Sequence, residues 1–492
     1  MKESVDKSIF VVTFPLRTEK WQEDRIDKMM RILTSLYHDK QKLLLSRYIH
    51  LSHTPQFKNA KELGKGVFKT YMSENGFSKF SFVKIFSDST LHKEQNKLSE
   101  TLLTHGLNSR IIEYLAHCSW QAWEKKLFGN GKFIKTDNEI NIIKSRLVGG
   151  AIIGFTYSFE KCFISMSASK PKRHEIFSIP FKVNRNSEYE LFAATQEVRN
   201  IAIVRKQIRG THKYYVQFSF AGTPYNKGRN MGKGVVGIDP GPSKIAVVSD
   251  EKVAIYPLAM SITEDEQAVA RLKRKLDRSR RSTNPELYNE DGTYIKGKKQ
   301  QVFSNHYIET RSKLADSQRK LAAKRKIAHN VLANEIISLG NEFRVEDNSF
   351  RSMQTRAKET KKNANGKNIS KRRFGKSLRN HAPAEFKTIL ENKVKQYPDG
   401  VFVDIPNSIA CTQYDFTNKE FTKHELKERT IITSDGQRHN RDTLAAFNMK
   451  FVQTKQIAGK NKIEKSAELF DNNAMAEFYS QYCELEKNIA NE

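Results

Sequence analysis

The chain has 492 residues, with 85 Lys or Arg against 55 Asp or Glu, and its formal net charge is +30. A chain of this length is too long for one domain with a single hydrophobic core, so we predict about two to four domains. The content of 38% apolar and 10% aromatic residues excludes a wholly disordered chain. The charge favours nucleic acid as the partner, because protein cations release counterions from phosphates. A basic protein whose Lys content only reflects an AT-rich genome is the alternative.

The cysteines and the apolar runs restrict the class of protein further. Cys118, Cys162, Cys411 and Cys483 are widely scattered and form no pair at metal-ligand spacing, so they predict neither a disulfide framework nor a cysteine-built zinc site. No apolar run approaches the roughly 20 residues that a membrane-spanning helix needs, and residues 1–6 contain no apolar signal core. We expect a cytoplasmic protein with reduced thiols and no membrane partner.

The first half of the chain is predicted to be a β-rich region that helices interrupt. Residues 8–14 are mostly apolar, with β-branched and aromatic side chains, and stop at Pro15, which predicts a strand. Residues 17–140 are then predicted to be a helical insertion, because apolar residues recur at helical spacing between charged ones. The first of these apolar residues are Ile26, Met30, Leu33, Tyr37 and Leu44.

Strand-like patterning returns after this insertion. Residues 155–159 alternate aromatic with small or polar side chains, which is typical of a half-buried strand. Residues 201–208 and 214–220 are predicted strands on either side of a hairpin turn at residues 210–213.

A second unit is predicted to start near residue 233. It opens with an apolar strand at residues 234–238. A basic helix at about 265–281 and a second long helix near 304–339 follow, as their periodicity indicates.

Three acidic residues far apart in the sequence are candidates for one metal site. Asp239 ends an apolar strand, Glu346 ends a short strand after a break at Gly340, and Asp442 begins a helix. Asp347 is the alternative to Glu346, because a shift of one residue in register would exchange them. Capping a turn or a helix, or lying in solvent, is the alternative role of each acid taken alone.

Together, the three acids indicate metal-dependent chemistry. Two strand-end carboxylates and one helix-start carboxylate can meet at one edge of a sheet, where their mutual repulsion requires a cation. Mg²⁺ prefers oxygen ligands and suits carboxylates plus a substrate phosphate. Two such ions, about 3.5–4 Å apart, promote phosphodiester hydrolysis. The small residues Ala445 and Ala446 in the helix after Asp442 predict close packing on the sheet.

Several segments resemble motifs of the TnpB family of insertion-sequence proteins, which are relatives of the type V CRISPR effectors. Residues 237–246 resemble the first RuvC motif of the family, residues 345–347 the second and residues 441–447 the third. Residues 271–285 are similar to the basic helix after the first motif, and residues 289–293 extend that match.

The resemblance covers residues 234–450 well and the N-terminal half by architecture only. It implies an α/β plus β fold, with an RNase H-like (RuvC) catalytic domain and an N-terminal wedge β-barrel interrupted by a helical recognition lobe. The implied domains are a first wedge segment (residues 1–16), the recognition lobe (17–140), a second wedge segment (141–232), the first two RuvC-like segments with the basic helix (233–405), a degenerate zinc-ribbon-like insert (406–438), and the third RuvC-like segment with a C-terminal tail (439–492).

The resemblance also implies an RNA-guided, Mg²⁺-dependent DNA endonuclease of a mobile element. Its partners would be a guide RNA and double-stranded target DNA, its catalytic and metal-binding acids Asp239, Glu346 and Asp442, and its cofactor two Mg²⁺ ions, with Mn²⁺ as an alternative. A compact type V CRISPR effector, a guide-dependent DNA-binding repressor without cleavage, and a transposase performing strand transfer are the alternatives.

One departure from the family concerns zinc. Family members often carry a four-cysteine zinc ribbon between the second and third motifs, whereas this chain has only Cys411 there. A single cysteine cannot build a tetrahedral thiolate site. We therefore expect no structural zinc, and we expect residues 422–426 and their neighbours to hold the segment by other contacts.

Candidate nucleic-acid contacts lie on the basic helix and in the segment from Arg351 to Lys376, which contains ten Lys or Arg residues. Phosphate contact accounts for cations around most of that helix, whereas a solvated loop is the alternative for the segment. Trp120, Trp123 and residues 214–215 are candidates for base stacking, although core packing is the favoured role. The predicted binding residues are Arg271, Arg274, Lys275, Arg278, Arg280, Arg281, Lys371, Arg372 and Arg373.

Overall fold

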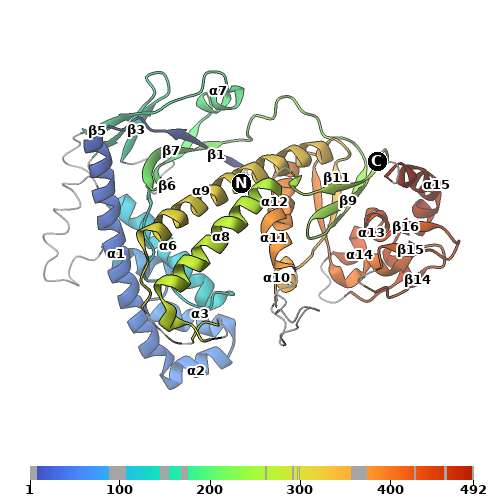
Figure 1. Cartoon of the computed structure of the whole chain (residues 1–492), viewed down its shortest axis with the longest axis horizontal. Helices are drawn as coiled ribbons and strands as arrows, with labels where there is room; N and C mark the ends of the chain where they lie inside the picture. Colours follow the sequence, from blue (N-terminus) through green and yellow to red (C-terminus); the bar gives the residue numbers. More distant parts are fainter. Residues whose placement is uncertain are drawn as a thin grey trace, which may run out of the picture. The chain divides into compact units, whose positions relative to one another are not determined.

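The computed structural model forms two units, Met1–Lys227 and Gly228–Glu492 (Figure 1). Their boundary falls a few residues before the expected one at residue 232. The residues that the structure describes are 8–87, 107–144, 154–167, 175–260, 263–290, 293–295, 297, 300–355, 359, 374–425, 428–458 and 463–489.

The first unit contains a four-stranded antiparallel sheet in the order β1-β7-β6-β2. Strand β1 pairs along its whole length with β7, from Ile9 opposite Ala221 to Pro15 opposite Tyr215. The helices that follow β1 therefore separate it from β7 in the sequence, although the two strands are neighbours in one sheet. The strands are β1 (Ile9–Pro15), β2 (Ile142–Lys144), β6 (Val198–Ile208) and β7 (Thr211–Ala221).

The β6–β7 hairpin is present, but its turn begins earlier than predicted. Arg209 and Gly210 form the turn, with φ angles of 53° and 81°. Positive φ at both central residues is the geometry of a type I′ turn, which matches the twist of the flanking strands. Residues 211–213, which we predicted in the turn, therefore belong to β7.

Helices fill the interruption between β1 and β2, as the periodicity predicts, and five of them lie in the described ranges 8–87 and 107–144. The apolar residues that marked the first helix, Ile26, Met30, Leu33, Tyr37 and Leu44, are all buried. Trp120 and Trp123 are buried as well, and the Trp123 indole donates to Gln41 at 2.7 Å, so their core role is confirmed. The helices are α1 (Lys20–Ser52), α2 (Pro55–Glu62), α3 (Lys65–Glu74), α4 (Lys79–Ser87) and α6 (Ser109–Phe128).

A second sheet of the first unit packs against the first through aromatic side chains. It consists of β3 (Phe155–Ser158), β4 (Phe163–Ser167) and β5 (Glu175–Pro180). Leu16 after β1 bridges Phe181 after β5, and Phe159 lies 4.8 Å from Phe218 between ring centroids. Among the described residues no pairing joins β2 to β3, and the described strands form two sheets that are bridged at Leu16 and Phe181.

The second unit is built on a five-stranded mixed sheet in the order β10-β9-β8-β11-β12. The first three strands are antiparallel, whereas β11 and β12 run parallel to β8. Their bounds are β8 (Val235–Pro240), β9 (Lys244–Val248), β10 (Val253–Pro257), β11 (Glu342–Glu346) and β12 (Val401–Ile405).

Helices cover both faces of this sheet, because its central strands are apolar on both sides. Val236 and Ile238 of β8 share a core with Ile336 and Leu390, which belong to α9 (Asn305–Ile337) and α12 (Pro383–Val394). Side chains of the other face share a core with α13 (Arg441–Lys450) and α15 (Asn472–Ile489). The second unit is therefore a three-layer α/β structure.

The basic helix α8 (Thr263–Thr283) lies alongside α9, as Figure 1 shows. Both helices closely match the predicted ranges. Ser304 caps α9, since its hydroxyl accepts from the Tyr307 amide at 3.2 Å. Shorter helices are α7 (Glu188–Ala194), α10 (Phe350–Met353), α11 (Gly375–His381) and α14 (Thr454–Ile457).

Two small hairpins occupy the segment expected to lack zinc. The Asp415 carboxylate joins them, because it accepts from the amide and hydroxyl of Ser434 at 2.8 and 3.0 Å. Of residues 422–426, Thr422 contributes a backbone bond to Gln413 at 2.8 Å, and Leu426 lies outside the described residues. The hairpin strands are β13 (Tyr414–Asp415), β14 (Glu420–Phe421), β15 (Thr430–Ile432) and β16 (Arg438–Asn440).

No helix in the described ranges is long and apolar enough to cross a membrane.

Candidate carboxylate site

The register of two parallel strands brings Asp239 and Glu346 together. Ile238 of β8 pairs with Val345 of β11, so the next residue of each strand lies at the same edge of the sheet. Both acids are buried, with 8% and 7% of their surface exposed. A hydrogen bond joins their carboxyl groups. Two of the three predicted acids therefore form a contact pair.

Burial governs the protonation of this pair. Burial raises the pKa of Asp239 well above its ordinary value, and the neighbouring charges of Glu346 and Asp442 raise it further. Burial also raises the pKa of Glu346, against the opposing effect of its hydrogen bonds from Asn348 and Asp239. Both shifts favour the protonated form of the pair when no cation is bound.

Two asparagines hold Glu346 in this position. The Asn348 amide donates to the Glu346 carboxylate at 2.5 Å and to the Pro240 carbonyl at 3.3 Å. Asn407 donates in turn to the Asn348 side-chain oxygen at 3.0 Å. We did not predict either asparagine. The position of Asn348, two residues beyond Glu346, was the available signal, because such residues share a side of an extended chain.

Asp347, the alternative to Glu346, points elsewhere. Its side chain is 66% exposed and pairs with Lys387 at 3.1 Å, and Lys387 also pairs with Asp404 at 2.6 Å. Successive side chains of a strand point to opposite sides, and here it is the side chain of Glu346 that points toward Asp239.

Asp442 lies in the first turn of α13 and does not cap it. The cap is Asn440, whose side chain accepts from the Asp442 amide at 2.9 Å. The Asp442 carboxylate instead lies 3.5 Å from Arg429 and 3.4 Å from Arg441. It is near enough to Asp239 to raise the pKa of that residue.

The three acids do not form a closed ligand set. In the described part of the chain, no group of three His, Cys, Asp or Glu side chains has a geometry that could hold a metal ion. Asp239 and Glu346 are in contact, whereas the Asp442 carboxylate is paired with two arginines. The donors nevertheless fit Mg²⁺ chemically, because they are all oxygens and because two of the carboxyl groups are buried in contact with each other.

Close packing of α13 on the sheet places Asp442 near this edge. A Cβ at Gly237 of β8 would lie 2.0 Å from the Ala446 carbonyl oxygen, so only glycine allows the approach. Ala445 and Ala446 are both fully buried. The predicted small-residue face is therefore confirmed.

Two cations, the partly buried Arg344 and the buried Lys450, fix the end of α13. Arg344 of β11 donates to the carbonyls of Lys450 and Val452 at 2.6 and 2.8 Å. Lys450 donates to the Val235 carbonyl and to Asp250, both at 2.7 Å. The helix is thus tied to the same two strands that carry Asp239 and Glu346.

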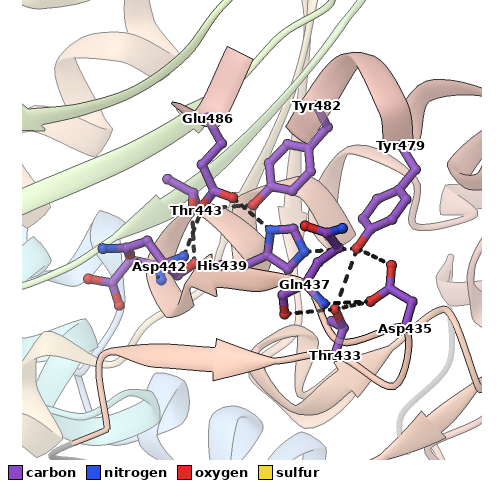
Figure 2. A network of polar contacts seen from close by, with 10 residues as sticks. Thr433, Asp435, Gln437, His439, Asp442, Thr443, Tyr479, Tyr482 and Glu486 are labelled. Atoms are coloured by element: carbon purple, nitrogen blue, oxygen red, sulfur yellow. Dashed lines mark hydrogen bonds and ion pairs between the residues drawn. The ribbon is translucent and has the colours of Figure 1, made fainter. Parts of the chain in front are cut away.

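A polar network fixes the start of α13 (Figure 2). His439 lies 2.7 Å from Glu486 through Nδ1 and 2.9 Å from the Tyr479 hydroxyl through Nε2. Tyr479 donates to Asp435 at 2.8 Å, and Glu486 also accepts from the Asn440 amide at 3.0 Å. Figure 2 shows the Asp442 carboxylate pointing away from this network. The network therefore positions the helix and leaves Asp442 outside it.

The predicted nucleic-acid residues differ in their surroundings. Arg271, Arg274, Lys275 and Arg278 are exposed on α8. Arg280 and Arg281 instead pair with Asp277 at 2.7 and 2.8 Å. Lys371, Arg372 and Arg373 lie outside the described residues.

Comparisons with known proteins gave structural matches only. The profiles of known protein families do not match the chain, and no curated protein matches it in sequence. A Cas12f1–sgRNA–target DNA complex is 12% identical, with a TM-score of 0.47 over 90% of this chain and 99% of that chain. A CRISPR-Cas12f ternary complex is 16% identical, with a TM-score of 0.26 over 91% and 83%. A Cas12i–crRNA–dsDNA complex is 10% identical, with a TM-score of 0.29 over 95% and 69%.

Proposed function

We propose that the protein is an RNA-guided, Mg²⁺-dependent DNA endonuclease whose second unit is an RNase H-like catalytic domain of the TnpB kind. The observation that supports this most is the buried contact between Asp239 and Glu346 at the ends of two parallel strands. Two buried carboxyl groups in contact are unfavourable for folding unless a positive charge or a proton offsets them. In the part of the chain that the structure describes, neither acid forms a salt bridge, so the pair is suited to hold a cation.

Asp239, Glu346 and Asp442 are the metal-binding acids in this proposal. Two Mg²⁺ ions, or Mn²⁺ in their place, would supply an activated water and a stabilised leaving oxygen. Asp239 would bind the ions as a carboxylate, releasing any proton to solvent. Asn348 holds the Glu346 carboxylate toward Asp239. The Asp442 carboxylate would have to leave Arg429 and Arg441 to serve as a ligand.

The partners in this proposal are a guide RNA and double-stranded target DNA. The charge of +30 supports binding of phosphate backbones in general, and the guide rests on the resemblance of residues 237–246 and 441–447 to the TnpB motifs. The wedge, recognition-lobe and RuvC domains, and the origin of the protein in a mobile element, are proposed on the same ground.

The test is cleavage of DNA that matches the RNA bound to the protein. RNA that co-purifies with the full chain would be sequenced, and a duplex carrying the matching sequence would be incubated with the complex and Mg²⁺. We expect Asp239→Asn to abolish cleavage and to leave the amount of bound RNA unchanged, because it removes an ion ligand and no cation.

Asp347→Asn is the matched control, since it removes the neighbouring strand-end carboxylate, which faces away from the pair. We expect this variant to cleave like the parent. If Asp239→Asn cleaves as fast as the parent, Asp239 does not belong to the catalytic site and the proposal is wrong.

A further inference from the structure

An open hollow of about 430 Å³ lies where α8 ends and α9 begins. Its lining includes Lys275, Arg278 and His306 together with hydroxyl side chains, among them Ser282 and Ser304. None of the described residues that line it is acidic. Cationic groups and hydroxyl donors around one hollow suit an anion with several acceptor oxygens, such as a phosphate.

The cations of α8 fall into two groups. Asp277 pairs with Arg280 and Arg281, and both guanidinium groups lie over the Tyr288 ring, at 5.9 and 4.8 Å from its centroid. Lys275 and Arg278 form no ion pair with any described residue. Their charges therefore remain available to a ligand.

The nearest acid on α9 does not neutralise them. Glu309 is close enough for Lys275 and His306 to lower its pKa. Its carboxylate, however, pairs with Lys313 at 2.6 Å. The hollow keeps a net positive charge.

An exposed aromatic pair lies beside the hollow. Phe303, next to Ser304 in the chain, stacks on Tyr307 with ring centroids 4.6 Å apart and an interplanar angle of 16°. Phe303 is 38% exposed, so part of its ring is open to solvent. Exposed aromatic rings next to cations are typical of surfaces that bind single-stranded nucleic acid, because unpaired bases stack on them.

Hydrogen bonds from a buried asparagine fix the backbone next to this aromatic pair. Asn284 is fully buried, and its side chain both accepts from the Val302 amide at 2.7 Å and donates to the Val302 carbonyl at 2.9 Å. Ser279 and Ser304 also lie 3.2 Å apart between their hydroxyls. These contacts fix the position of the aromatic pair relative to the hollow, and such preorganisation lowers the entropic cost of binding.

We propose that this tip of the α8–α9 hairpin binds a single nucleic-acid strand, with backbone phosphates in the hollow and an unpaired base on Phe303. The proposal rests on the proposed function and adds a strand-binding site to it. Its test measures binding of nucleic acid and does not depend on cleavage. Of the six predicted cations of α8, it assigns phosphate contact in the hollow to Lys275 and Arg278 and excludes Arg280 and Arg281.

The experiment compares two double variants of the full chain after bound RNA has been removed. Lys275→Gln with Arg278→Gln and Arg280→Gln with Arg281→Gln each remove two positive charges from the same helix. Binding of fluorescent oligo(dT) and oligo(rU) would be measured across a salt series, and circular dichroism would verify that both variants are folded.

We expect the first variant to bind more weakly and to lower the slope of log K against log salt by about 1.4, which corresponds to two lost phosphate contacts on a single strand. We expect the second variant to keep the slope of the parent. Equal losses of affinity in the two variants would show that binding depends only on the total charge of the helix, and this would overturn the proposal. An unchanged slope in the first variant would overturn it as well.

A third variant tests the aromatic part. Phe303→Ala should weaken single-strand binding by roughly 5-fold to 100-fold and leave binding of a blunt duplex unchanged, because paired bases cannot stack on the ring. An equal loss with the duplex would contradict the stacking role. A larger effect with oligo(rU) would indicate an RNA strand at this site, and a larger effect with oligo(dT) a DNA strand, and either result supports the proposal.

Discussion

Two carboxyl groups buried in contact are costly for a fold unless a proton or a cation lies between them. Burial is the main cause of the raised pKa values of Asp239 and Glu346, and these shifts favour a proton on the pair when no cation is bound. The strand-end positions of both acids were readable from the sequence. The role of Asn348 was signalled only by its spacing of two residues from Glu346, and the contact itself depends on the path of the chain after β11.

At the residue scale, we expect Asn348→Ala to reduce metal affinity. The variant removes the 2.5 Å hydrogen bond that orients Glu346, and loss of such a bond to a metal ligand lowers metal affinity by roughly 10–100-fold. A titration with Mn²⁺ followed by electron paramagnetic resonance measures this directly. Asn330→Ala is the control, since Asn330 donates only to a carbonyl on the exposed side of α9. Equal affinities in the two variants would contradict the role of Asn348.

The helix α13 shows how an element is positioned by contacts at both ends and along one face. Its end is tied by Arg344 and Lys450 and its start by the network around His439. Its small-residue face was predictable from Ala445 and Ala446. The partner of that face, Gly237, lies more than 200 residues earlier in the chain, so no local pattern could identify it.

At the element scale, we expect Gly237→Ala to destabilise the second unit. The added methyl group would meet backbone atoms of α13 that cannot move without shifting the whole helix, and overpacking of this kind costs about 1–3 kcal/mol. Urea denaturation measures the loss. Gly66→Ala is the control, because a Cβ at Gly66 meets nothing within 4 Å. An equally small effect at both positions would show that α13 is not tightly packed.

Helix α9 contains a buried titratable group whose protonation opposes folding. His329 is fully buried and packs edge-on against Phe386 of α12. Burial lowers the pKa of His329 from its usual value of 6.5. The charge of Glu385 and the backbone of His381 act in the opposite direction, whereas the charges of Arg325 and His381 add to the effect of burial. The unfolded chain therefore binds a proton at a pH where the folded chain does not.

We accordingly expect stability to fall as the pH drops below about 6.5, since the unfolded state binds more protons there. His329→Leu removes this proton uptake and should flatten the decline between pH 7 and pH 5. Urea unfolding at several pH values measures the two slopes. Parallel curves for the parent and the variant would show that His329 does not contribute.

At the scale of the whole molecule, the net charge of +30 attracts nucleic acid over a longer range than any individual contact. The charge itself is known from the sequence, but its distribution is not. Asp277 forms ion pairs with Arg280 and Arg281 at spacings of three and four residues. This pairing follows the ordinary helical rule and could have been predicted, so including both arginines among the binding residues overlooked a local signal.

We expect nucleic-acid binding by the whole chain to weaken steeply with salt. A protein that makes 6–10 phosphate contacts loses about 10³–10⁵ in affinity between roughly 50 and 200 mM salt. Fluorescence anisotropy with a duplex probe measures the slope. Asp239→Asn should keep the slope of the parent, because it removes no cation that grips a phosphate. A flat profile would contradict multiple phosphate contacts.

The sequence by itself determined the elements of this protein: the helical interruption of the first sheet, the bounds of α8 and α9, and the three acids at element ends. These depend on periodicity and caps, which act over a few residues. Only the tertiary structure decided which of Glu346 and Asp347 faces Asp239, that Asp442 pairs with arginines, and that two sheets of the first unit meet at one bridge. Those outcomes depend on strand register and packing. Ile238 pairs with Val345 and Leu16 with Phe181, each more than 100 residues away, and the ion pairs of Asp442 depend on the folded positions of Arg429 and Arg441.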